Sequence, residues 1–280
     1  MDDDKLLAAV GRTAIGVARV RAGESARPDA LFSDPYAAGF VAASGVTFDA
    51  EAPDPADRAR RSAIALHVVV RTRFFDDYLL EATGAAGCRQ VVLVGAGLDT
   101  RAFRLDWPDG TRLFELDQPA VLRLKDEVLA AEGALPRCER TTLPVDLRES
   151  WSPQLVAAGL RPDLPTAWLA EGVLVYLEPH VAAAVLDELT AVSSPGSRFS
   201  AERGDRARRM AAGDRPLQPD DVVSMWQDGV AGGLASWLDG HGWTSRQHEL
   251  ADLAARYDRP APAATRSGFV TATRTGGPTG

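Results

Sequence analysis

The segment VVLVGAGLDTRAFR, residues 91–104, joins an apolar run to a glycine-x-glycine turn followed by an acid, a hydroxyl and an arginine. Glycine has no Cβ atom, so the backbone at Gly95 and Gly97 can approach a ligand closely. Such turns bind nucleotide-type ligands, but a dinucleotide fingerprint would place a third glycine where Thr100 stands. We therefore expect Gly95, Ala96 and Gly97 to contact a nucleotide-type ligand, and other residues must indicate which one.

Two carboxylates narrow the choice of ligand. Asp117 lies twenty residues after Gly97, in FELDQP, where it can accept hydrogen bonds from the ribose of NAD or of S-adenosylmethionine. Asp99 stands in the turn itself, where a carboxylate repels a diphosphate and attracts a ligand that carries an ammonium and a sulfonium. Asp99 and the missing glycine favour S-adenosylmethionine over NAD. The alternative interpretation is that the glycine turn and the two acids bind no ligand and that the acids are simply exposed to solvent.

Strand and helix patterns alternate from residue 89 onward. Short β-branched runs predict strands at 89–97, 111–119, 139–147, 166–177, 197–205, 243–249 and 268–274. Helical patterns lie between them at 119–133, 151–160, 178–192 and 233–243. This alternation predicts an α/β fold with a seven-stranded, mostly parallel, doubly wound sheet. Ligands bind beyond the carboxyl ends of such strands, where the glycine turn and Asp117 fall.

The first 84 residues predict a helical cap. Helical patterns cover 5–22, 36–44 and 57–83, and Gly84 ends the last of them. Residues 85–280 are expected to form the ligand-binding core. Within that core, residues 205–229 are rich in Arg, Asp and Pro and interrupt the alternation. They predict an insertion that acts as a lid over about 205–240.

Composition argues against several classes of function. The chain has 31 basic and 39 acidic side chains and a net charge of −8, which disfavours binding to nucleic acid or to an anionic membrane. Cys88 and Cys138 lack disulfide or zinc spacing, and the four histidines form no metal pattern, so no metal is expected. No apolar run approaches the ~20 residues that span a bilayer. A cytoplasmic protein without a membrane span is predicted.

Several motifs in fixed order resemble one family. VVLVGAGLDTRAFRL, FELDQPAVLRLK, PVDLR and WLAEGVLVYLEP resemble the bacterial branch of the leucine carboxyl methyltransferase-like family, as do RTRFFDD and GW…YDRP…FVTATR. The resemblance covers the chain from about residue 10 to residue 274. It implies a class I, Rossmann-like fold and an S-adenosylmethionine-dependent O-methyltransferase that releases S-adenosylhomocysteine.

The resemblance also implies which residues bind the cofactor. Arg73 matches the arginine that pairs with the methionine carboxylate through its bidentate fork. A salt bridge from Arg73 to Asp76 or Asp77 on its own helix is the rival interpretation. The turn beside the methionine matches Gly95, Ala96, Gly97 and Asp99. The ribose-binding acid matches Asp117, which Gln118 follows.

Three further motif positions complete the implied site. Asp146 and Leu147 match the adenine site, although Asp146 as a helix N-cap is an alternative. Glu171, followed by Gly172, matches the acid near the cofactor's amine or sulfonium, and a carboxylate after the apolar run AWLA is hard to explain as a core residue. Tyr176 borders the expected acceptor pocket as the candidate catalytic residue, with a core tyrosine as the alternative.

The expected reaction is direct, in-line methyl transfer to an oxygen of a small-molecule acceptor. A carboxylate is already anionic at neutral pH and needs no general base, whereas a phenol or an alcohol needs one. No residue stands out as that base, which favours a carboxylate such as that of a natural-product or lipid-like acid. Two alternatives stay open: an NAD-dependent oxidoreductase, and a protein that binds S-adenosylmethionine without catalysis.

Overall fold

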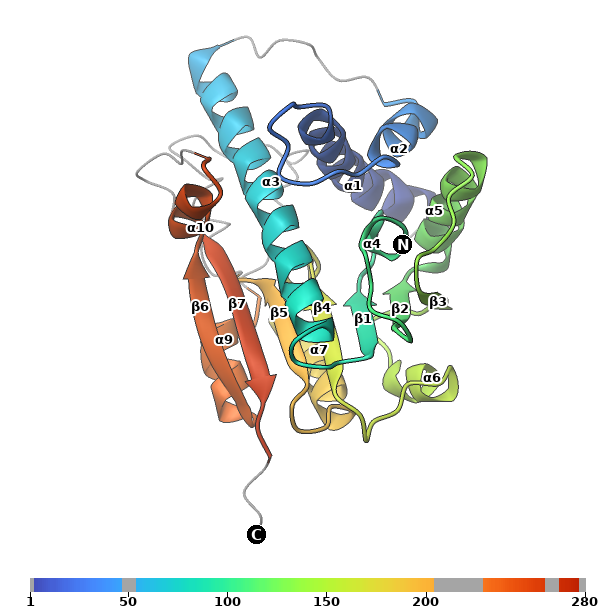
Figure 1. Cartoon of the computed structure of the whole chain (residues 1–280), viewed down its shortest axis with the longest axis vertical. Helices are drawn as coiled ribbons and strands as arrows, with labels where there is room; N and C mark the ends of the chain where they lie inside the picture. Colours follow the sequence, from blue (N-terminus) through green and yellow to red (C-terminus); the bar gives the residue numbers. More distant parts are fainter. Residues whose placement is uncertain (1–2, 47–53, 204–228, 260–266, 277–280) are drawn as a thin grey trace.

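Seven strands form one mixed sheet (Figure 1). The computed structural model describes residues 3–46, 54–203, 229–259 and 267–276, and the strand order within them is β3-β2-β1-β4-β5-β7-β6. The parallel strands are β1 (Gln90–Val94), β2 (Arg112–Asp117), β3 (Glu139–Pro144), β4 (Thr166–Ala170) and β5 (Arg198–Glu202). β7 (Gly268–Arg274) pairs antiparallel with β5 and with β6 (Trp243–Glu249). The predicted seven-stranded, mostly parallel α/β fold is confirmed.

Helices cover both faces of the sheet. One face carries α3 (Pro55–Thr83), α4 (Arg101–Arg104), α5 (Pro119–Ala131) and α10 (Leu250–Arg256), with α3 crossing in front of the strands in Figure 1. The other face carries α6 (Ser152–Ala157), α7 (Pro179–Ala191) and α9 (Leu234–Gly240), and η1 (Leu174–Tyr176) precedes α7. α1 (Asp3–Ser25) and α2 (Ala37–Ser44) pack on each other and on α5. Among the segments that the structure describes, no helix has the length and apolar character to cross a membrane.

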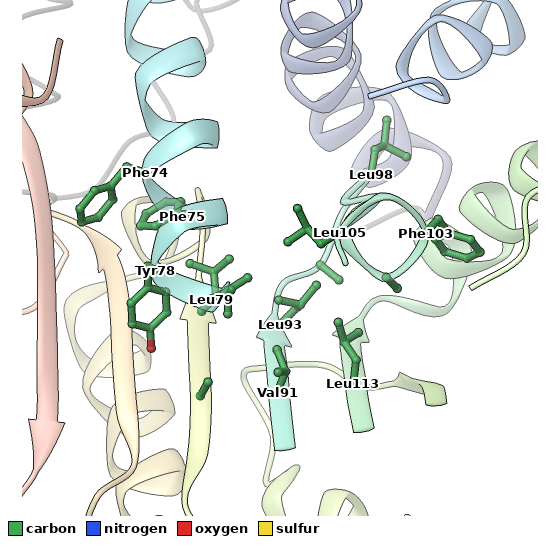
Figure 2. Packing of buried hydrophobic residues seen from close by; sticks show 14 of the residues in the cluster. Phe74, Phe75, Tyr78, Leu79, Val91, Leu93, Leu98, Phe103, Leu105 and Leu113 are labelled. Carbon is green, nitrogen blue, oxygen red and sulfur yellow. The ribbon is translucent and has the colours of Figure 1, made fainter. Parts of the chain in front are cut away.

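Alternating side chains divide the hydrophobic core into two layers. On β1, Val91 and Leu93 belong to the layer under α3, whereas Val92 and Val94 belong to the layer with α7. Figure 2 shows the first layer, where Leu79 projects from α3 toward β1. Because both faces are covered, the strand reads as a continuous apolar run instead of an alternating one.

Short-range signals set the helix ends. Pro119 and Pro179 occupy the first turns of α5 and α7, where a missing N–H loses no helical hydrogen bond. Gly133 follows α5 with φ 64°, the left-handed conformation that glycine adopts readily. The helical patterns in the sequence do not include α10, which is seven residues long. Its Leu250 and Leu253 are buried in the first core layer.

The division of the chain into a cap and a core at residue 84 stays a prediction. α3, the last helix of the expected cap, shares a core layer with β1 and β2. Most of the expected lid at 205–240 lies outside the described residues, which resume at residue 229. α9 lies near the end of the expected lid range, and its Leu238 is buried in the second core layer.

The N-terminal helix contacts the loop that follows β1. Arg21 of α1 donates a hydrogen bond to the Leu98 carbonyl at 2.6 Å and pairs with Asp34 at 3.1 Å. The Arg21 side chain is buried, so this contact ties α1 to the loop that carries the glycine turn. α1 therefore helps to position the candidate site.

Candidate active site

The loop after β1 turns sharply beside the loop after β4. Gly95 has φ 68° and Gly97 has φ 48°, both in the left-handed region. A Cβ atom on Gly95 would lie 2.7 Å from Cγ2 of Val173, whereas a Cβ on Gly97 would meet no atom within 4 Å. The Ala96 N–H donates to the Leu116 carbonyl of β2 at 2.9 Å. Gly95 thus allows two loops to pack closely, and Gly97 borders open space.

Gly95→Ala is expected to destabilise the protein more than Gly97→Ala. Both variants place an alanine at positive φ, which costs about 1–2 kcal/mol. Only the Gly95 variant also overlaps Val173, which adds about 1–3 kcal/mol. Urea denaturation of both variants measures the difference. Equal losses of unfolding free energy would show that the loop after β4 moves aside at no cost.

Asp117 holds the glycine turn from the end of β2. Its Oδ2 accepts a hydrogen bond from the Gly97 N–H at 2.6 Å, and its Oδ1 accepts one from the Gln118 N–H at 2.7 Å. Burial raises the pKa of Asp117, and the two N–H groups offset only part of that effect. The structure therefore brings Gly97, Asp117 and Gln118 together at the carboxyl edge of the sheet.

Asp146 and Leu147 follow β3, the neighbour of β2. The Asp146 carboxylate accepts hydrogen bonds from the backbone N–H and the Nε of Arg148, both at 2.9 Å. Arg148 lowers the pKa of Asp146 to about 2, and the nearby Gln118 side chain adds to this effect. Leu147 packs, partly buried, against the second core layer. Asp146 and Gln118 therefore lie near each other beyond β3 and β2, while the adenine-binding role stays a prediction.

Glu171 and Gly172 begin the loop after β4, next to the end of β5. The Glu171 Oε1 pairs with Arg71 Nε at 2.8 Å and its Oε2 pairs with Arg101 Nη1 at 2.6 Å. Arg71 also reaches Glu202 of β5 at 2.8 Å, and Glu202 accepts the Gly172 N–H at 2.7 Å. Burial opposes ionisation of Glu171, but the two guanidiniums outweigh it and keep its pKa below the usual range. Burial raises the pKa of Glu202.

Asp99 pairs with Arg101, a partner that the motif does not indicate. Its Oδ1 accepts the Arg101 N–H at 2.7 Å, and its Oδ2 contacts the Arg101 guanidinium. Burial opposes ionisation of Asp99, yet Arg101 and then Lys125 lower its pKa to about 2. The carboxylate expected to attract a cationic ligand therefore belongs to a buried ion network.

Arg73 pairs with residues outside this ion network. Its Nε pairs with Asp77 at 2.9 Å, one helical turn along, and its Nη1 donates to the Leu31 carbonyl at 2.8 Å. This i,i+4 pair is the rival interpretation named for Arg73. Arg71, two residues earlier, reaches Glu171 instead, because residues two apart point to different sides of a helix. The sequence RTR contains both arginines and does not distinguish them.

Two further titratable side chains lie near Arg71. Tyr176 of η1 is partly buried and within electrostatic reach of Arg71, and its catalytic role stays a prediction. His67 lies one helical turn before Arg71 on α3. Burial and then the charge of Arg71 lower the pKa of His67 to about 3, so the imidazole is neutral at physiological pH.

The strand order, the glycine turn after β1, the acid at the end of β2 and the acid after β4 define a class I, Rossmann-like methyltransferase fold. A crystal structure of a "putative methyltransferase" from Thermobifida fusca YX shares this fold with a TM-score of 0.55 at 16% identity, over 80% of this chain and 90% of that one.

The chain belongs to the leucine carboxyl methyltransferase family, whose sequence profile matches residues 14–190. A relative from Parafrankia sp. (strain EAN1pec) is 46% identical over 273 residues, 95% of this chain and 88% of its own. One from Streptomyces coelicolor is 48% identical over 256 residues, 90% of this chain and 89% of its own. Both carry the name "Putative S-adenosyl-L-methionine-dependent methyltransferase". The implied family is confirmed, and S-adenosylmethionine is the cofactor of this class.

Proposed function

We propose that this protein is an O-methyltransferase that transfers the methyl group of S-adenosylmethionine to a carboxylate of a small molecule. The observation that carries the proposal is the charge state around Glu171. Arginines keep Asp99 and Glu171 ionised, and both oxygens of Glu202 are engaged by Arg71 and a backbone N–H. His67, with a pKa of about 3, is a weak base. Asp99, Glu171 and His67 are therefore poor general bases at neutral pH, and a carboxylate acceptor needs no general base.

The residues at the carboxyl edge fit the cofactor. Open space borders Gly97, and Asp117 lies at its rim as an acceptor for ribose hydroxyls. The ionised Asp99 and Glu171 suit an ammonium and a sulfonium. Binding of the methionine carboxylate by Arg73 stays a prediction, and Arg71, which pairs with Glu171, is a second proposed arginine of this site. The other proposed cofactor contacts are Gly95, Ala96, Gly97, Asp99, Asp117, Gln118, Asp146, Leu147, Glu171 and Gly172.

When bound at this edge, S-adenosylmethionine would supply its sulfonium methyl group to the acceptor oxygen and leave as S-adenosylhomocysteine. The chain contributes alignment and exclusion of water, effects worth up to ~7–11 kcal/mol in intramolecular models. Asp117 and the glycine turn hold one end of the site, and Glu171 with its two arginines defines the other. We propose that Tyr176 orients the acceptor through its hydroxyl. A natural-product or lipid-like carboxylic acid is the proposed acceptor class.

Calorimetric titration with S-adenosylmethionine, S-adenosylhomocysteine and NADH tests the cofactor. Micromolar binding of the first two without binding of NADH supports the proposal. Binding of NADH alone would contradict it and favour the oxidoreductase alternative.

Methyl-labelled S-adenosylmethionine then tests the acceptor with matched panels of carboxylic acids and phenols. A labelled product that alkali hydrolyses to methanol identifies a methyl ester and supports the carboxylate. An alkali-stable product would identify an ether and overturn that assignment. Cofactor binding without transfer to either panel would favour the non-catalytic alternative.

A further inference from the structure

Arg101 is the side chain at which the ion network of the site converges. It begins α4, directly after the glycine turn, and its side chain is 1% exposed. Its Nε pairs with Asp76 of α3 at 2.7 Å, and its Nη1 pairs with Glu171 at 2.6 Å and also contacts Asp99. Its Nη2 donates to the Thr72 carbonyl of α3 at 3.3 Å. Three segments distant in the sequence therefore meet on one guanidinium, where α3 passes the end of β1 (Figure 1).

The cluster around Arg101 holds more carboxylates than guanidiniums. Its members are Arg71, Arg101, Arg104, Asp76, Asp99, Glu171 and Glu202. The charge of Lys125 also lowers the pKa of Asp99, but the Lys125 ammonium is itself paired with Glu115 at 2.9 Å. A buried cluster with surplus carboxylate favours the approach of a cation from outside. The ammonium and sulfonium of the cofactor are such cations.

We propose that Arg101 is a positioning residue of the methyltransferase site, which fixes Asp99 and Glu171 as neighbouring carboxylates for the cationic end of the cofactor. The inference rests on the proposed function. Without a shared cation, two buried carboxylates repel each other and take up protons. Arg101 acts through Asp99 and Glu171 and is not assigned a contact with the cofactor or the acceptor.

Arg104 provides a matched control on the same helix. Its side chain is 4% exposed and pairs with Asp76 through two hydrogen bonds at 2.7 Å. Its guanidinium lies over the ring of Phe32 and influences Asp99 only as a more distant charge. Arg104→Met therefore removes a buried arginine from the same network while keeping the bonds of Arg101 to Asp99 and Glu171.

The test compares Arg101→Met and Arg104→Met with the wild-type protein by calorimetric titration with S-adenosylmethionine. Arg101→Met is expected to weaken binding by about tenfold or more at about pH 8, as the loss of charge-assisted contacts predicts. That loss should grow as the pH falls to about 5, because burial then raises the pKa of Glu171 and Asp99 and their protonation removes the attraction. Arg104→Met should stay within about threefold of wild type and follow its pH profile.

Urea unfolding of the ligand-free proteins gives a readout that does not depend on the cofactor. In the wild-type protein the pKa values of Asp99 and Glu171 are lowered, so their stabilisation is present at neutral pH and lost as the pH falls through those values. In Arg101→Met, the folded-state pKa values of Asp99 and Glu171 are expected to lie above their unfolded values, so the pH dependence of stability has the opposite sign. Its stability relative to Arg104→Met should therefore increase as the pH falls from about 8 to about 5.

The proposal would be overturned if Arg101→Met and Arg104→Met lost the same affinity for S-adenosylmethionine and if their affinity and stability changed with pH in parallel. Failure of the wild-type protein to bind S-adenosylmethionine would instead contradict the proposed function, and the unfolding comparison would still test Arg101. If Arg101→Met does not fold, Arg101→Lys and Arg104→Lys replace the pair, because a lysine ammonium cannot reproduce the guanidinium fork. Weaker binding confined to Arg101→Lys would support the proposal, and equal binding would overturn it.

Discussion

Glu171→Ala is expected to lower the free energy of unfolding by about 3–5 kcal/mol, the typical effect of removing one partner from a buried ion pair. Glu171 is 14% exposed and bridges Arg71 and Arg101, at 2.8 and 2.6 Å. Its loss leaves Arg101, which is 1% exposed, and Arg71, which is 11% exposed, with one carboxylate fewer to compensate them. Urea denaturation followed by tryptophan fluorescence measures the change, since Trp151 and Trp168 are fully buried.

Glu139→Ala is the matched control for this prediction. Glu139 pairs with Arg112 at 3.1 Å, but its side chain is 65% exposed, and exposed pairs contribute about 0–1 kcal/mol. Glu171→Gln keeps an acceptor oxygen for one arginine and should lose less stability than Glu171→Ala. Equal losses for Glu171→Ala and Glu139→Ala would contradict a buried ion network at Glu171.

Asp117→Ala should weaken binding of S-adenosylmethionine by at least about tenfold. A hydrogen bond to a charged group contributes about 1.5–3 kcal/mol, equivalent to roughly 10–150-fold in affinity. The structure adds a second reason for a large effect, because Asp117 also accepts the N–H groups of Gly97 and Gln118. The variant loses both a proposed ribose acceptor and the contact that holds the glycine turn. Calorimetric titration with S-adenosylmethionine and S-adenosylhomocysteine measures the loss.

Two variants separate these contributions of Asp117. Asp117→Asn keeps an oxygen that can accept the Gly97 N–H, so it should preserve the turn better than alanine while lowering affinity through the lost charge. Asp163→Ala removes an exposed aspartate that pairs with Arg161, and it should leave cofactor affinity unchanged. If Asp117→Ala bound the cofactor as tightly as Asp163→Ala, Asp117 would have no part in the site.

The types of the main elements can be predicted from short stretches of sequence. The apolar run at 91–94 predicts a strand because a parallel strand is buried on both faces. Pro119 and Gly133 mark the two ends of α5 for reasons confined to the local backbone. The helical patterns in the sequence do not include α4 and α10. Phe103 of α4 and Leu250 of α10 are buried in the first core layer, so packing against the rest of the fold contributes to both helices.

Part of the candidate site is equally local. Gly95 and Gly97 follow β1, Asp117 ends β2, and these strands are parallel neighbours in register. Parallel neighbours end at the same edge of the sheet, so the predicted turn and the predicted acid meet, with the Gly97 N–H 2.6 Å from Asp117. This contact required only the motif spacing and the strand order.

The ion network, by contrast, depends on the tertiary structure. Arg71 and Arg73 stand in the same tripeptide, and only the path of α3 over the sheet decides that Arg71 reaches Glu202, 131 residues away, while Arg73 reaches Asp77. Arg101 is likewise visible in the motif, yet its partners come from α3 and from the loop after β4. Element types and loop motifs arise from interactions within a few residues, so the sequence specifies them locally. Ion pairs between distant segments depend on how the core layers place α3, α4 and β4 against one another.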